Sequence, residues 1–67
     1  MINVVVNGER CQVPVGLTVK TLLEHLQLDS SRVAVELNRT IVRKPFWATE
    51  PIEDGAAIEI VMFVGGG

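Results

Sequence analysis

The chain has 67 residues and a formal net charge of −2, from eight acidic and six basic residues. This length allows one domain with a small core, which can hardly shield a private active site from water. We therefore expect a module that works inside a larger partner, and not an enzyme. Hydrophobic residues make up 48% of the chain, which indicates a folded domain. The charge balance argues against a nucleic-acid-binding surface, and no apolar run approaches the ~20 residues that span a bilayer.

Cys11 is the only cysteine, so it can form no disulfide within the chain. Residues 1–4 show neither the charged nor the apolar segment of a signal peptide. We therefore expect a cytoplasmic protein, because thiols stay reduced in that compartment. Cys11 lies in an alternating segment, which predicts a small apolar core residue; a persulfide site is the alternative.

A β-hairpin is predicted at the start of the chain. Two strand-like segments, Ile2–Val6 and Glu9–Val13, flank Asn7-Gly8. Asn-Gly between such segments is typical of a type I′ turn, which needs a positive φ at both central residues. Pro14 ends the second strand, because proline cannot donate to a ladder.

A short amphipathic helix follows the hairpin. Thr18 is suited to the N-cap position, and Leu17 and Leu22 fall at the positions of a hydrophobic staple. The apolar positions recur at i, i+3, i+4 and i+7, namely Val19, Leu22, Leu23 and Leu26. We predict a helix of about ten residues that packs on the hairpin, since so short a helix is marginal alone.

Three further strands are predicted. They cover Val33–Leu37, residues 41–42 and residues 57–64, with turns at 38–40 and Asp54-Gly55 and an irregular segment or single helical turn at 43–51. The predicted order is β-β-α-β-β-β. This order indicates an α+β domain over residues 1–64, in which a mixed sheet of four to five strands packs on one main helix. If the first and last strands pair in parallel, the last strand is central.

Period-two alternation assigns the faces of the predicted sheet. In the last strand we expect Ile58, Ile60, Met62 and Val64 to point toward the helix. The outward apolar residues of the sheet are then Val5, Ala34, Val61 and Phe63. Such a patch beside the end of the chain indicates a partner-binding surface. The alternative is that these residues only reflect strand propensity.

Three glycines, Gly65, Gly66 and Gly67, follow the last predicted strand. Packing does not call for three in a row, because glycine loses more backbone entropy on folding than any other residue. We expect residues 65–67 to form a flexible arm that reaches roughly 10 Å beyond the fold. Such an arm would present the Gly67 carboxylate to a cleft in another protein; a frayed tail or a truncated linker is the alternative.

These features occur together in one known family. The segments that carry the likeness are Thr18-Val19, Leu22-Leu23, Val33-Ala34-Val35-Glu36-Leu37-Asn38, Ile41-Val42, Trp47, Glu53-Asp54-Gly55, Ile58-Glu59-Ile60-Val61 and Phe63-Val64-Gly65-Gly66-Gly67. Along its whole length the chain resembles the ThiS family, the sulfur carriers of thiamine biosynthesis. The terminal glycines are specific only together with the chain length and the Asp-Gly turn ten residues before Gly65.

The resemblance implies the ubiquitin-like β-grasp fold, with the first and last strands parallel. It implies that an E1-like adenylyltransferase of the ThiF type uses ATP to adenylate the Gly67 carboxylate. Sulfur from a sulfurtransferase or cysteine desulfurase would then give a thiocarboxylate, which a thiazole synthase of the ThiG type consumes. The carrier would be a protein co-substrate with no bound cofactor, no metal and no catalytic residue of its own.

Other functions remain open at this point. The sulfur could go to a molybdopterin precursor, a tRNA base or an amino-acid pathway. Gly67 could instead be joined to lysine in protein tagging, or the domain could be an interaction module with an inert tail.

One departure from the family is Arg39, because members often have glycine after the residue that aligns with Asn38. Arginine tolerates a positive φ poorly, so we expect a different turn there.

The remaining polar residues indicate no second site. We expect solvated side chains at Glu24, His25, Arg39, Arg43, Lys44, Glu50, Glu53 and Asp54. For the last three residues, an acidic rim that attracts a basic partner is the alternative. Trp47 lies among prolines and is expected to plug the end of the core.

Overall fold

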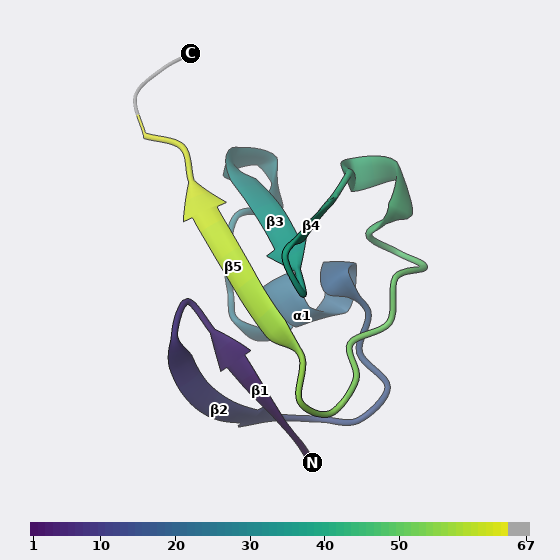
Figure 1. Ribbon diagram of the computed structural model, residues 1–67. Coiled ribbons are helices and arrows are strands. Elements are labelled where there is room, and N and C mark those ends of the chain that lie inside the picture. The colour runs from purple at the N-terminus through teal and green to yellow at the C-terminus, as the bar shows by residue number, and fades with distance from the viewer. Residues whose placement is uncertain (65–67) are drawn as a thin grey trace.

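The computed structural model describes residues 1–64, which form a five-stranded sheet with one α-helix across one of its faces (Figure 1). The elements are β1 Ile2–Val6, β2 Glu9–Val13, α1 Val19–His25, β3 Val33–Leu37, β4 Thr40–Val42 and β5 Ala57–Met62, with 3₁₀ turns at Ser30–Arg32 and Lys44–Phe46. The strands lie in the order β2-β1-β5-β3-β4. β1 and β5 are parallel, and the other neighbours are antiparallel. The predicted α+β class, element order and central last strand are confirmed.

The first hairpin closes as predicted. Val6 pairs with Glu9, so Asn7 and Gly8 alone form the turn, with φ values of 50° and 83°. Asn7 tolerates this region because its short polar side chain can bond to nearby backbone. Here the side chain reaches the central strand: Oδ1 accepts from the Ile60 N–H at 2.7 Å, and Nδ2 donates to the Ile60 carbonyl at 3.1 Å. The turn thereby extends the pairing of β1 with β5 by one residue.

The β3–β4 turn corrects one expectation. Leu37 pairs with Thr40, so β4 begins one residue before the predicted strand and only Asn38 and Arg39 remain for the turn. Both have positive φ, 51° and 70°, so the expectation that arginine enforces a different turn is wrong. The strand register leaves only two turn residues, and Asn38 stabilises them. Its N–H donates to the Ala57 carbonyl at 2.7 Å, and its Oδ1 accepts from the Ala57 N–H at 2.9 Å.

The helix begins as predicted but ends early. Thr18 is the N-cap, and its side chain and that of Thr21 bond to each other's backbone N–H groups in a capping box. The helix has seven residues and not about ten, because Gln27 adopts φ 60°. The Gln27 N–H then donates to the Glu24 carbonyl and the Leu28 N–H to the Leu23 carbonyl, each at 3.0 Å. This is the Schellman pattern, which terminates a helix even though glycine is absent here.

The core lies between α1 and the sheet face that α1 covers. Its buried members are Val4, Val13, Val19, Leu22, Leu23, Val33, Val35, Trp47, Ile52, Ala56, Ile58 and Ile60. Trp47 is 6% exposed, and its Nε1 donates to the Val42 carbonyl at 2.7 Å. The expectation that it closes the end of the core is confirmed. The other face of the sheet, toward the viewer in Figure 1, carries no helix among the described residues.

Candidate docking face and tail root

The end of β5 and the two residues after it form an exposed apolar segment, which we call the tail root (residues 61–64). Its side chains are 54%, 52%, 58% and 92% exposed for Val61, Met62, Phe63 and Val64. The expectation that Met62 and Val64 point into the core is wrong, and β5 ends at Met62 and not at residue 64. Alternation along a strand shows which face of the sheet a side chain lies on, but it does not show how far the layer that covers that face extends. Ile60 is the last buried residue of this strand.

The predicted partner-binding residues do not all lie together. Ala34 is directly opposite Val61 in the β3–β5 ladder, and the Phe63 N–H donates to the Arg32 carbonyl at 2.8 Å next to it. Val5 is in register with Ala57, four residues before Val61 along β5. At ~3.3 Å per residue this is a separation of about 13 Å. The structure thus groups Ala34, Val61 and Phe63 and places Val5 near the other end of the same face.

Two acidic residues interrupt this face; period-two alternation in the sequence places both on it, but does not show that they lie opposite each other. Glu36 and Glu59 are directly opposite each other in the β3–β5 ladder, between the position of Val5 and that of Val61. Like charges in this position repel each other. Within residues 1–64 the one ion pair found is Arg32–Asp29, so neither glutamate is neutralised by an ion pair there. Only the register of the last strand against β3 could have indicated this pair.

The backbone of β5 is paired on both sides only in its first half. Phe63 donates to Arg32, so the alternation of an antiparallel ladder turns the N–H and C=O of Met62 to the opposite side. On that side, the last hydrogen bonds are those between the side chain of Asn7, which follows β1, and the backbone of Ile60. Among residues 1–64, the second half of β5 is therefore held from the β3 side alone.

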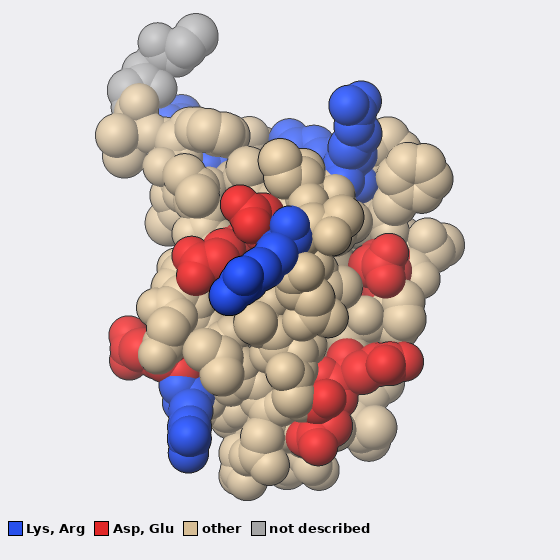
Figure 2. Space-filling model, in the orientation of Figure 1, with Lys and Arg blue, Asp and Glu red and all other residues tan. Residues whose placement is uncertain are grey.

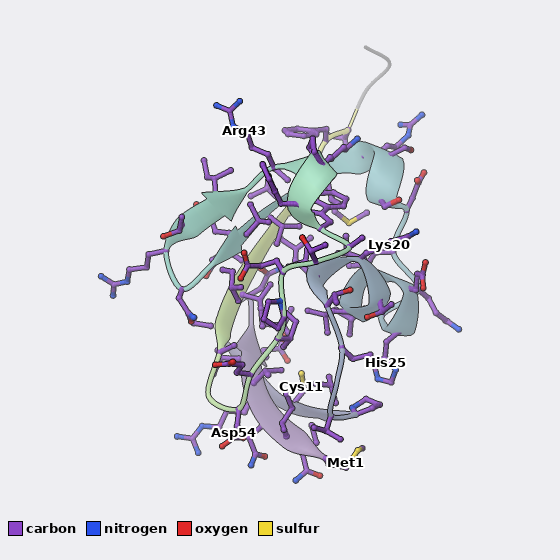
Figure 3. All side chains as sticks on the ribbon, turned by 90° about the vertical axis from the view of Figure 1, so that its right-hand side faces the viewer. Met1, Cys11, Lys20, His25, Arg43 and Asp54 are labelled. Carbon is purple, nitrogen blue, oxygen red and sulfur yellow. The ribbon has the colours of Figure 1, made fainter. Side chains whose placement is uncertain are left out.

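The other candidate residues lie at the surface or at the edge of the core. Cys11 is half-buried against the core, and Glu24 and His25 are exposed on α1. Asp54 lies at the end of the molecule opposite the tail root (Figure 3), where its Oδ1 accepts from the Asn3 N–H at 2.8 Å. Within residues 1–64, no group of three or more His, Cys, Asp or Glu is arranged to hold a metal, and no helix is long and apolar enough to cross a membrane.

Residues 65–67 lie outside the described part of the chain, so the predictions for Gly65, Gly66 and Gly67 stay predictions.

Comparison with known proteins identifies the family of this chain. The sequence profile of the ThiS family matches residues 2–67. This chain belongs to the ThiS family. The family predicted from the sequence is therefore confirmed.

Individual members of the ThiS family support the same assignment. The chain is 33% identical to the sulfur carrier protein ThiS of Escherichia coli, over 91% of this chain and 92% of that protein. A crystal structure of the thiamine biosynthesis protein ThiS from Geobacter metallireducens superposes with a TM-score of 0.85 at 33% identity, covering 98% of this chain and all of that one. The predicted β-grasp fold is confirmed by this likeness.

A third relative is longer. The chain is 46% identical over 63 residues to a protein of Paramagnetospirillum magneticum named thiazole synthase. The match covers 94% of this chain but 19% of that protein, so this chain spans about a fifth of the relative's length. A ThiS-like region and a second, larger part are thus joined in one polypeptide there.

Proposed function

We propose that this chain is a sulfur carrier of thiamine biosynthesis, in which the Gly67 carboxylate is converted to a thiocarboxylate. The observation that carries the proposal is the tail root, whose exposed apolar side chains lead directly into Gly65, Gly66 and Gly67. A partner that binds the tail root would aim the glycines into its own cleft. Membership of the ThiS family supports the same role.

The chemistry follows from the weakness of a carboxylate as an acyl donor. A ThiF-type adenylyltransferase would bind ATP, and an oxygen of the Gly67 carboxylate would attack the α-phosphate, so that pyrophosphate leaves. A persulfide sulfur from a sulfurtransferase or cysteine desulfurase would then attack the acyl carbon and displace AMP. Two electrons from a thiol would cleave the remaining sulfur–sulfur bond and leave the thiocarboxylate. The carrier supplies no acid, base or metal to these steps.

A thiazole synthase is the proposed recipient of the sulfur. Regions similar to this chain occur within longer proteins named thiazole synthase in two bacteria, Paramagnetospirillum magneticum and Magnetococcus marinus. Joining two modules in one chain raises their effective concentration for each other, which supports a working contact between carrier and synthase.

The proposed docking surface is the uncovered face of the sheet near the tail root. Phe63 and Val61, with Ala34 beside them, would be its apolar anchors, and Val5 would be a separate contact beyond the Glu36–Glu59 pair. A few buried aromatic or aliphatic residues usually carry most of the binding free energy of an interface. The body of the domain would thereby offset the roughly 3–6 kcal/mol lost when three arm residues become ordered.

Two measurements test the proposed function. Intact-mass spectrometry of the protein isolated from its own cells should detect a fraction heavier by one oxygen-to-sulfur exchange, which alkylation shifts further. Deletion of Gly67, or addition of one residue after it, should abolish ATP–pyrophosphate exchange with the adenylyltransferase while the unfolding temperature stays unchanged. Normal exchange in both variants would reject a role for the Gly67 carboxylate.

Two matched controls separate this function from its alternatives. Gly66→Ala should lower the rate of adenylation at saturating carrier more than it weakens docking, because a side chain there meets only the nucleotide cleft. Weaker docking with an unchanged saturated rate would instead make the tail a binding epitope. Conjugates to lysine, found by mass spectrometry of cell extracts, would favour protein tagging.

A further inference from the structure

The basic residues of the molecule are concentrated toward one end (Figure 2). Four of the six basic residues surround the side where β5 ends, and we call them the basic rim: Lys20, Arg32, Arg43 and Lys44. Glu53 and Asp54 precede β5, and Glu50 lies beside Asn38 at that opposite end. Figure 2 shows basic side chains at the upper end and acidic ones at lower right, with side chains of both signs across the middle and at lower left.

The basic rim adjoins the tail root through short connections. The Arg32 carbonyl accepts from the Phe63 N–H at 2.8 Å, and Ser30 and Ser31 come directly before Arg32. These serines line a shallow hollow together with Lys20, Lys44, Trp47 and Ala48. The Lys20 N–H donates to the Trp47 carbonyl at 3.0 Å, and the Lys44 Nζ lies 5.8 Å from the centre of the Trp47 ring. The hollow is therefore lined by two lysines and two serines, and the Ser31 hydroxyl already donates to the Asp29 Oδ1 at 2.6 Å.

The carboxylate of Asp29 lies beside the four cations of the basic rim, which therefore keeps an excess of positive charge. Asp29 pairs with Arg32 at 4.0 Å, and this is the one ion pair found in residues 1–64. Lys20, Arg43 and Lys44 are exposed and take part in none there. A concentration of uncompensated charge at one end creates a field that orients an approaching partner of opposite sign.

Two kinds of anion could fill the hollow, a phosphate group or the carboxylates of a protein. A phosphate-binding site is built from hydrogen-bond donors in fixed positions. Residues 1–64 hold no buried side-chain polar atom that lacks a hydrogen-bond partner, so no buried side-chain donor there is free to bind a phosphate. The donors here are instead exposed side chains, those of Lys20, Lys44 and Ser30. In addition, the phosphates of the proposed reaction would meet Gly67, beyond the tail root. These features favour an extended acidic protein surface.

We propose that the basic rim docks against an acidic surface that surrounds the tail-receiving cleft of the adenylyltransferase, an inference that rests on the proposed function. The partner's Asp and Glu side chains would occupy the hollow between Lys20 and Lys44. The same acidic surface would repel Glu50, Glu53 and Asp54 at the opposite end. The electric field between the basic rim and this acidic surface therefore orients the carrier so that its tail enters the cleft first. Such orientation raises the association rate more than the final affinity.

The test is ATP–pyrophosphate exchange by the cognate adenylyltransferase, measured as kcat/KM for the full-length carrier at low and high salt. The double variant Lys20→Glu/Lys44→Glu should lower kcat/KM at low salt by about tenfold or more, with the rate at saturating carrier unchanged. High salt should lower the wild-type value toward that of the variant, since charge effects are screened beyond about 8 Å at physiological ionic strength. The control Arg10→Glu/Arg39→Glu makes the same change in net charge near the start of β5, and it should have a much smaller effect.

Each contrary outcome has a definite meaning. Equal losses of kcat/KM in both double variants would assign the effect to net charge and would contradict the proposed docking of the basic rim. A wild-type kcat/KM that does not change with salt would also contradict this docking, even if the Lys20/Lys44 variant failed to fold. Inorganic phosphate titrated into the carrier should give no saturable amide shifts at Ser31 and Lys44; saturable shifts would assign the hollow to a small anion. Absence of exchange with wild-type carrier would reject the proposed function, and the rim with it.

Discussion

The first part of β5, Ala57–Ile60, and the tail root that follows it differ in both burial and backbone pairing. In Ala57–Ile60, both isoleucine side chains are buried and the backbone is bonded to neighbours on both sides, with Asn7 and Asn38 adding side-chain hydrogen bonds. In residues 61–64, all four side chains are more than half exposed, and the backbone is held from the β3 side alone. One segment of the chain thus contributes first to the core and then to the surface.

This difference shows how a small domain can offer a binding segment without weakening its fold. Exposed apolar surface has a cost in water, and a chain of 67 residues has little stability to lose. Here the exposed part follows the buried part in the same strand, so the core fixes the direction in which the tail root leaves the domain. The four predictions below test that division, from the largest expected effect to the smallest.

The largest contrast is expected between Ile58 and Val61. Ile58→Ala should lower the free energy of unfolding by about 2–5 kcal/mol, because it removes a fully buried side chain from the core. Val61→Ala should change it by less than about 0.5 kcal/mol, since Val61 is half exposed. Chemical denaturation measures both, and Ile58→Val should give about 0.5–1.5 kcal/mol if the alanine variant does not fold. A similar loss at both sites would contradict the division of the strand.

The second contrast concerns binding and not stability. Phe63→Asp should weaken the complex with the adenylyltransferase by about 2 kcal/mol or more, because Phe63 is the aromatic residue of the tail root. The thermal unfolding temperature should stay the same. Val15→Asp is the matched control, because Val15 is 75% exposed and follows β2 at the opposite end of the molecule. Equal binding losses in both variants would show that Phe63 has no special role.

Much of this division could be predicted from the sequence, and the exceptions have physical reasons. The hairpin at Asn7-Gly8 and the cap at Thr18 were predictable because both depend on neighbouring residues. The positive φ values of Gln27 and Arg39 were not, because the helix end and the strand register impose them on residues that disfavour them. The predicted docking residues include Phe63 and Val61, but the Glu36–Glu59 pair and the exposure of Met62 required knowledge of the register and the extent of the core.

The third prediction concerns the asparagines that bond to the first half of β5. Asn7→Gly keeps the positive φ but removes both hydrogen bonds to Ile60, which lie in a partly buried place. We expect a loss of about 1–2 kcal/mol in the free energy of unfolding, and faster amide hydrogen exchange at Ile60. Asn38→Gly, which removes one exposed bond to Ala57, should cost less. An equal cost at both turns would show that burial of the bonded groups does not matter here.

The smallest effect is expected at Asp29, which supports the β3 side of the tail root. Its Oδ1 accepts from the Ser31 hydroxyl at 2.6 Å and from the Ser31 N–H at 3.0 Å, in the 3₁₀ turn whose Arg32 carbonyl holds Phe63. These bonds, the hydroxyl first, together with the charges of Arg32 and Lys44, hold the pKa of the Asp29 carboxyl below its ordinary value. A carboxylate with a lowered pKa in the folded state stabilises the fold above its unfolded pKa, and this contribution is lost as the pH falls through the folded pKa.

Asp29→Asn should therefore destabilise the domain slightly at neutral pH, by less than the other substitutions, because Asp29 is exposed to solvent. The difference from wild type should shrink as the pH falls from the ordinary aspartate pKa through the lower pKa of the folded state, below which the wild-type carboxyl is neutral as well. Chemical denaturation at neutral and acid pH measures this difference, and an NMR titration of the Asp29 carboxyl should give a midpoint below that of an unstructured aspartate. A stability difference that is constant with pH would show that hydrogen bonding at Asp29, and not its charge, supports the turn that holds the tail root.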